Sequence, residues 1–153
     1  MMVGLPSSGK STYALEYANL YHAEIVSSDN IRKEMFDDIN DQNHNTEVFA
    51  EVHKRIIDDK NIVFDATNIN YKRRKALLEE INKFDCEKIC NVVAVPYLEC
   101  LHRNSLRDRK VPEDVIKRMY LNFYMPQYYE GWDKIYFIWN IDYARKLNFM
   151  ARE

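Results

Sequence analysis

The sequence is poor in the residues that loosen or interrupt a chain. Its 153 residues include only three glycines and four prolines, which excludes low-complexity and Pro/Gly-rich disordered segments. Apolar residues make up 46% and charged residues 30%, as in an ordinary globular domain. The length suffices for one buried core, and we find no internal repeat. We therefore expect one domain over residues 1–153.

Cysteine is also scarce. Cys86, Cys90 and Cys100 form neither a CxxC pair nor an even set, and no histidine lies at ligand spacing from them. This predicts free thiols rather than disulfides or zinc. There is no signal-peptide pattern, and no segment approaches the ~20 apolar residues of a membrane span. We expect a cytoplasmic protein with no membrane partner, and its oligomeric state stays open.

A strong excess of one charge is missing too. The formal net charge is −2 and the pI is near 6.1. Proteins that coat nucleic acid carry a strongly basic face. Any nucleic-acid contact must therefore be local and involve few phosphates.

What is present is an alternation of β-type runs with helical patterns. The expected strands cover residues 1–3, 23–26, 61–65, 89–95 and 134–139. The expected helices cover residues 10–21, 46–59, 71–84 and 98–107, and two more begin at 29 and 112. This order predicts an α/β fold, a parallel sheet of about five strands with helices on both faces and ligands beyond the carboxyl ends of the strands. The first run is short for a strand, which leaves open whether the natural chain begins upstream.

A phosphate-binding loop follows the first strand. Residues 4–11 read GLPSSGKS and match G-x-x-x-x-G-K-[ST] in full, between a strand and a helix. The glycines let backbone N–H groups turn toward an anion, and the following helix offers its N-terminus. Lys10 would reach the β and γ phosphates, and the Ser11 hydroxyl would ligate Mg²⁺. The other positions expected at the nucleotide are Gly4, Pro6, Ser7, Ser8, Gly9 and Thr12.

Two acids follow later strands. Asp29 and Arg32 share one helical face, where a carboxylate can take a hydroxyl proton and a cation can hold an acceptor phosphate. The alternative is a helix-capping Asp with a surface Arg. Asp65 ends an apolar run in a Walker-B-like arrangement and would orient Mg²⁺ or its water. Helix capping by Asp65 or Asn68 is the alternative there.

A cationic stretch at residues 102–110 lies between two expected helices. A mobile arginine segment can stabilise a transferring phosphoryl group, so we expect a helical lid over about residues 98–124. A solvated helix face is the alternative. The aromatic residues are expected mostly in the core. A late cluster could instead stack on a base; its members are Tyr120, Phe123, Tyr124, Tyr128, Tyr129 and Trp132.

In this order the motifs resemble those of the 5′-hydroxyl polynucleotide kinases, especially the phage type, within the wider group of small P-loop kinases. The shared text, up to about Tyr120, is GLPSSGKST, SSDNIR, DATNIN with its basic follower YKRRK, and VPYLECLHRNSLRDRKVPEDVIKRMY. The resemblance implies a P-loop NTPase fold. It also implies that Asp29 is the general base that activates the 5′-OH and that Arg32 holds the 3′-phosphate of the acceptor.

The same resemblance concerns the lid. Arg107 resembles the arginine on the transferring phosphate, and Arg103 matches a further lid position, which we assign to the nucleotide. The lid segment is one residue shorter than in the family, so the register of residues 108–110 stays open. The basic run at residues 72–75 could meet the acceptor strand or form a solvated helix face.

The sequence thus predicts transfer from ATP, or another NTP, with Mg²⁺ to a 5′-OH end of DNA or RNA. A related kinase for a small hydroxyl compound (a sugar, nucleoside, antibiotic or UDP-sugar) is the alternative. A nucleotide-binding switch is a third class, although such a switch needs no acceptor base like Asp29. The choice between DNA and RNA and the preferred NTP stay open.

Overall fold

The computed structural model describes residues 1–58 and 61–139. Its parallel strands are β1 (Met2–Val3), β2 (Glu24–Ser27), β3 (Ile62–Asp65), β4 (Ile89–Ala94) and β5 (Lys134–Trp139). The predicted α/β class and parallel strands are confirmed. The single five-stranded sheet is corrected, because the strands hydrogen-bond as β1-β4-β5 and as β2-β3. β1 has two residues and pairs only with β4; beyond its end, the Gly4 N–H donates to the Thr67 carbonyl in the loop after β3, at 3.0 Å.

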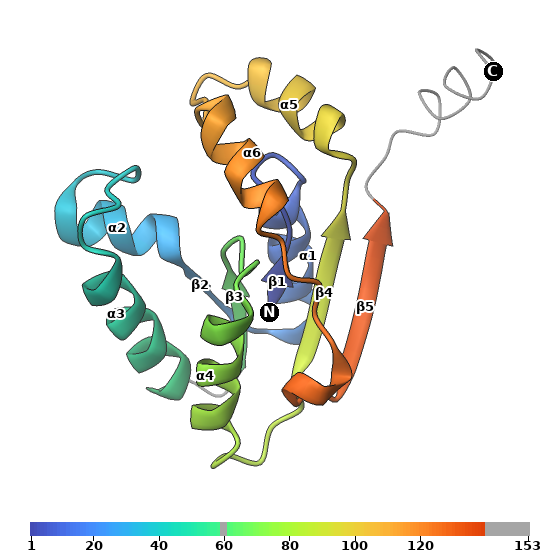
Figure 1. Cartoon of the computed structure of the whole chain (residues 1–153). Helices are drawn as coiled ribbons and strands as arrows, with labels where there is room; N and C mark the ends of the chain where they lie inside the picture. The colour runs from blue at the N-terminus through green and yellow to red at the C-terminus, as the bar shows by residue number, and fades with distance from the viewer. Residues whose placement is uncertain (59–60, 140–153) are drawn as a thin grey trace, which may run out of the picture.

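Helices cover both faces of the strands (Figure 1). They are α1 (Lys10–Tyr21), α2 (Ser28–Phe36), α3 (Asn45–Asp58), α4 (Tyr71–Ile81), α5 (Tyr97–Ser105), α6 (Glu113–Leu121) and the 3₁₀ turn η1 (Tyr128–Glu130). Residue 59 of the predicted third helix and the charged tail after Trp139 lie outside the described residues. Among the residues described, no helix is both long and apolar enough to cross a bilayer.

Alternation along the strands divides the core between the two faces. Met2, Val63 and Val93 pack with Ala14 and Ala18 of α1. Their sequence neighbours face the other way: Phe64 packs against α3 and α4, and Val3 and Val92 pack with Leu78 of α4. Successive strand side chains point to opposite faces, so one short apolar run supplies both layers. The strands pair in parallel, so their carboxyl ends lie at the same edge, where α5 follows β4 (Figure 1).

A buried ion pair joins α4 to the segment before β5. The Arg74 and Glu130 side chains are fully buried, and Arg74 Nε and Nη2 donate to the two Glu130 oxygens at 2.9 and 2.7 Å. Trp132 Nε1 also donates to Glu130, and Arg74 Nη1 donates to the Asn68 carbonyl. Burial alone raises the pKa of Glu130, but the bonds from Arg74 and Trp132 outweigh it and hold the pKa below its ordinary value.

The prediction that the aromatic residues mostly fill the core is wrong. Phe64 and Trp132 are buried, whereas many others in the described part are exposed; among these are Tyr120, Tyr124, Tyr128, Tyr129, Tyr136, Phe137 and Trp139. The residues 122–133 are held by the Arg74–Glu130 pair and by the backbone bond from Tyr124 N–H to the Ile69 carbonyl. That anchoring does not require the tyrosine rings to be buried.

The cysteines are free thiols, as predicted. Cys86 is exposed, while Cys90 and Cys100 are buried. Burial raises the pKa of both buried thiols to about 11, so they stay protonated at neutral pH and behave as small apolar side chains.

Glu130→Gln should destabilise the protein strongly, because it leaves the buried Arg74 charge uncompensated. We expect a loss of about 3–5 kcal/mol in the free energy of unfolding, measured by urea titration. Glu79→Gln is the control, since Glu79 forms an exposed pair with Lys75 on the same helix. That change should cost less than about 1 kcal/mol. Equal losses in the two variants would contradict the role of the buried pair.

Acid should act on the same pair. Since the folded state holds the Glu130 pKa below its ordinary value of 4.5, the pair stabilises the protein above that pH and the stabilisation is lost as the pH falls further. Urea midpoints measured between neutral pH and about pH 3 should fall more steeply for the wild type than for Glu130→Gln. Parallel curves would show that Glu130 titrates alike in the folded and unfolded chains.

Candidate functional site

The loop at residues 4–9 connects β1 to α1 at the carboxyl edge of the strands. Gly9 has φ +92°, a left-handed conformation that a side chain would strain. Gly4 is constrained by space, since a Cβ there would lie 2.8 Å from Ser8 Oγ and 3.0 Å from the Val93 carbonyl. No described side chain caps the first N–H groups of α1. These donors and the helix dipole thus remain available to an anion.

Lys10 begins α1 and lies beneath the loop. Its ammonium group donates to the Leu5 carbonyl at 2.9 Å, and the residue is buried. Burial lowers the pKa of Lys10 below its ordinary value, and attraction to Asp65 and Asp29 opposes that effect. Both acids therefore act on the same cation, although they come from different strand ends.

Ser11 and Asp65 lie together, as a Walker-type metal site requires. The Ser11 hydroxyl donates to Asp65 Oδ2 at 2.7 Å. Asp65 does not cap α4, and neither does Asn68, because the cap is Asn70. In the described ranges there is no cluster of three or more acidic, His or Cys ligands. This donor set fits Mg²⁺, which keeps several waters and uses one or two protein ligands with substrate phosphates.

Asp29 lies on the first turn of α2, and two arginines contact it. Ser27 caps the helix, so Asp29 is not the capping residue. Arg32 Nη1 lies 3.2 Å from Asp29 Oδ1, and Arg32 Nη2 donates to Asn45 Oδ1 at 2.9 Å. Arg32 is buried rather than on the surface, while about half of the Asp29 side chain is exposed. Both alternatives to the predicted pair, a cap and a surface Arg, are thus excluded.

Arg109 makes a second contact with Asp29, which the sequence does not predict. Its Nη1 lies 3.4 Å from Asp29 Oδ2, and its Nη2 donates to Asn40 Oδ1 at 3.0 Å. Arg109 lies in the cationic stretch, at a position whose register the resemblance does not fix. Nothing local distinguishes it from Arg107, because the contact to Asp29 spans 80 positions.

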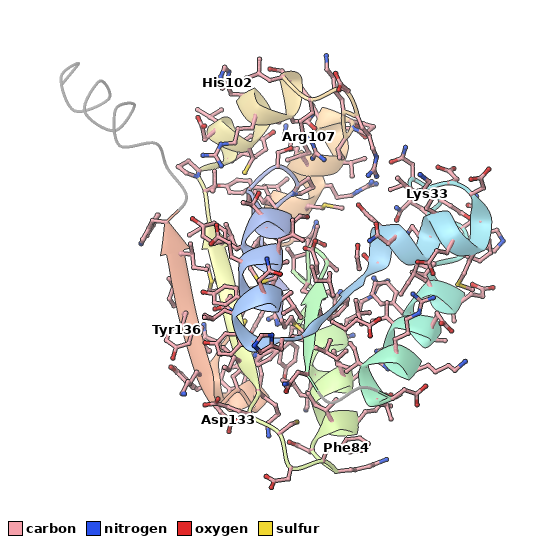
Figure 2. The ribbon with its side chains drawn as sticks, turned by 180° about the vertical axis from the view of Figure 1, so that it is seen from behind. Lys33, Phe84, His102, Arg107, Asp133 and Tyr136 are labelled. Carbon is pink, nitrogen blue, oxygen red and sulfur yellow. The ribbon has the colours of Figure 1, made fainter. Side chains whose placement is uncertain are left out.

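The two other arginines of the stretch reach the phosphate loop. Arg107 Nη1 donates to Ser7 Oγ at 3.2 Å, and Arg103 Nη1 contacts the Ser8 carbonyl at 3.5 Å. Arg107 lies above the start of α1 (Figure 2). The buried Asn104 side chain holds the α5–α6 loop by bonding both the N–H and the carbonyl of Val111. The solvated-face alternative therefore does not describe Arg103 and Arg107.

The remaining predicted positions fall around the same loop. Pro6 and Ser8 are buried, and Ser7 has a left-handed φ of +64°. Thr12 is exposed on the first turn of α1, next to Ser11. Every residue predicted for the site thus lies at one edge of the strands. The role of each stays a prediction.

A phosphate loop at the edge of a parallel sheet, with a serine and a carboxylate beneath it, defines the class of P-loop nucleotide-binding proteins. An AAA domain family model matches residues 1–126. The chain therefore belongs to this family of P-loop kinases.

Known proteins resemble the chain in sequence and fold. L-seryl-tRNA(Sec) kinase of Methanococcus maripaludis is 28% identical over 146 residues, 87% of this chain and 55% of the relative, so the chain spans about half the relative's length. A gluconokinase from Sinorhizobium meliloti has a TM-score of 0.66 at 15% identity, over 99% of this chain and 90% of its own. A fungal RNA kinase has a TM-score of 0.63 at 14% identity, over 90% of this chain and 37% of the kinase chain. The two structures show likeness of fold alone.

Lys10→Ala should weaken binding of a nucleoside triphosphate, because it removes a buried cation that lies beneath the phosphate loop. Loss of one charge-assisted bond corresponds to roughly 10- to 100-fold in affinity. Titration with a fluorescent ATP analogue would measure it. Lys33→Ala is the matched control on α2, since Lys33 is exposed and lies away from the loop (Figure 2). Unchanged affinity in Lys10→Ala would remove Lys10 from the site.

Proposed function

We propose that this kinase transfers the γ-phosphate of ATP to the 5′-hydroxyl end of a nucleic acid, with Asp29 as general base. The observation that carries the proposal is the placement of Asp29. Its half-exposed carboxylate lies near Lys10 and the phosphate loop, between Arg32 and Arg109. A hydroxyl nucleophile needs such an acceptor for its proton, whereas a nucleotide-binding switch does not.

The transfer would proceed in one displacement. Asp29 takes the hydroxyl proton as the new O–P bond forms, and ADP leaves from the opposite side of the phosphorus. Lys10 and the start of α1 hold the β and γ phosphates, while Arg103 and Arg107 stabilise charge on the transferring group. Mg²⁺, held through Ser11 and Asp65, would neutralise phosphate charge when bound.

The α5–α6 segment would act as the lid. Its loop carries Arg107 toward the nucleotide side and Arg109 toward Asp29. One segment thus touches both halves of the site, and its closure would exclude water from both. The Asn104–Val111 bonds would let this loop move as a unit.

Support for a nucleic-acid acceptor comes from the relatives and from the charge pattern. The similar proteins include an L-seryl-tRNA(Sec) kinase and a fungal RNA kinase. Arg32 supplies a buried cation beside Asp29, the proposed general base, and an acceptor phosphate would lie there. The gluconokinase and the net charge of −2 favour the second candidate, a small hydroxyl compound. Asp29 would serve as general base for either acceptor, so only the identity of the acceptor distinguishes the two candidate functions.

Asp29→Asn should lower the rate of transfer by about 10²- to 10⁴-fold while nucleotide affinity stays near that of the wild type. Transfer of label from γ-labelled ATP would be measured on 5′-OH DNA and RNA oligonucleotides and on a nucleoside and sugar panel. Glu34→Gln is the control, because Glu34 lies on the same helix and pairs with Arg55. It should keep full activity.

The acceptor that takes the label decides between the functions. Label on an oligonucleotide 5′ end, lost in Asp29→Asn, would support the proposal and rank DNA against RNA. Label only on a small compound would move the function to the second candidate. Near-normal turnover in Asp29→Asn would contradict the role of the base.

A further inference from the structure

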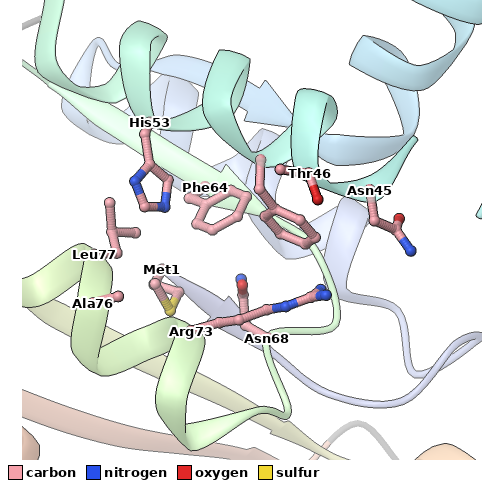
Figure 3. A pocket seen from close by; sticks show the side chains of 10 residues that line it. Met1, Asn45, Thr46, His53, Phe64, Asn68, Arg73, Ala76 and Leu77 are labelled. Atoms are coloured by element: carbon pink, nitrogen blue, oxygen red, sulfur yellow. The ribbon is translucent and has the colours of Figure 1, made fainter. Parts of the chain in front are cut away.

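A pocket of about 260 Å³ opens between α3 and α4 (Figure 3). Apolar side chains make most of its wall; they are Met1, Phe49, Phe64, Ala76 and Leu77. Polar groups come from Asn45, Thr46, His53, Asn68 and Arg73. None of the lining residues belongs to the phosphate loop, so the pocket is separate from the nucleotide site.

Arg73 brings a positive charge to this pocket that no acid among the described residues neutralises. Its guanidinium carbon lies 4.0 Å from the centroid of the Phe49 ring. Within the described ranges, no carboxylate lies at ion-pair distance from it, whereas the next residue, Arg74, is fully paired with Glu130. Although Arg73 is exposed, partial desolvation of its guanidinium and the neighbouring charge of Arg32 lower its pKa. An anion bound here would relieve the repulsion between the two arginines.

The pocket adjoins the acceptor side of the candidate site. Asn45 lines it and also accepts the hydrogen bond from Arg32, which in turn contacts Asp29. Since α3 begins at Asn45, the positive end of the helix dipole lies at the same rim. In Figure 3 the Arg73 side chain extends toward the end of α3 that carries Thr46 and Asn45. The Arg73 side chain, the buried Arg32 next to Asn45 and the positive end of the α3 dipole therefore lie at the same rim of the pocket.

We propose that this pocket binds the second nucleotide of a nucleic-acid acceptor, with its base against the apolar wall and its phosphate at Arg73. The inference rests on the proposed function, in which the terminal 5′-OH lies at Asp29 and the first phosphate at Arg32. Pockets for whole drug-sized ligands measure about 300–1,000 Å³, so this one suits a single ring system. Phe64, Ala76 and Leu77 offer a base an apolar wall. The Arg73 guanidinium, which lies over the Phe49 ring, can bind phosphate through charge-assisted bonds. A neutral sugar would leave the Arg73 charge without a counter-ion.

The test is an equilibrium titration, without transfer, of three acceptors of growing length. They are a nucleoside, a nucleoside 3′-monophosphate and a dinucleotide that carries a 3′-phosphate. In the wild type the second nucleotide should raise affinity by about tenfold or more. Arg73→Ala should lose most of that gain, and Arg73→Lys should restore part of it. Circular dichroism of the variants would verify that they fold.

Lys72→Ala is the matched control, since Lys72 is the adjacent cation and does not line the pocket. It should keep the gain from the second nucleotide. Equal affinity of the wild type for one and two nucleotides would overturn the proposal, and so would equal losses in Arg73→Ala and Lys72→Ala.

Failure of this inference can be told apart from failure of the proposed function. If the protein phosphorylates 5′ ends but Arg73→Ala binds the acceptors as the wild type does, the proposed role of the pocket is overturned and the proposed function stands. An Arg73-dependent gain without transfer to any nucleic acid would support the pocket as a nucleotide site and overturn the proposed reaction.

Discussion

The buried Arg74–Glu130 pair is the constraint on which the site depends. Arg74 also donates to the Asn68 carbonyl, and the Asn68 amide donates to the Met2 carbonyl at 2.8 Å. A continuous set of bonds therefore runs from the segment before β5, through α4, to the strand that begins the phosphate loop. Since β1 has only two residues, these long-range bonds supply the positioning that a longer strand would obtain from its own ladder.

The parallel topology divides the edge into two halves. The nucleotide half is built on β1 and α1, with Arg103 and Arg107 above it. The other half, where the proposed acceptor would bind, is built on β2, α2 and the start of α3, and there Arg32 donates to Asn45. Asp29 lies between the halves because α2 begins directly at the end of β2. The family model covers both halves, and the choice of acceptor rests on the proposals made for Asp29 and for the pocket beside Arg73.

Much of this arrangement could be predicted from local pattern. The range of α1 and the last strand were predicted as observed, and other elements differ by one to a few residues at their ends. The placement of the phosphate loop, Asp29 and Asp65 at one edge could be predicted, because each follows an apolar strand and the carboxyl ends of parallel strands share one edge of a sheet. The contact of Arg109 with Asp29 and the exposure of the late tyrosines were not found, because both depend on partners far along the chain.

The run at residues 72–75 separates what each level determined. The sequence by itself determined a helix with a cationic first turn, since helix formation and charge are properties of the local chain. It could not tell the four cations apart. Only the tertiary structure buries Arg74 against Glu130 and sets the exposed Arg73 over the Phe49 ring, while Lys72 and Lys75 are exposed away from that ring. The physical reason is that the free energy of a charge depends on its burial and its partner, and here the partner lies 56 positions away.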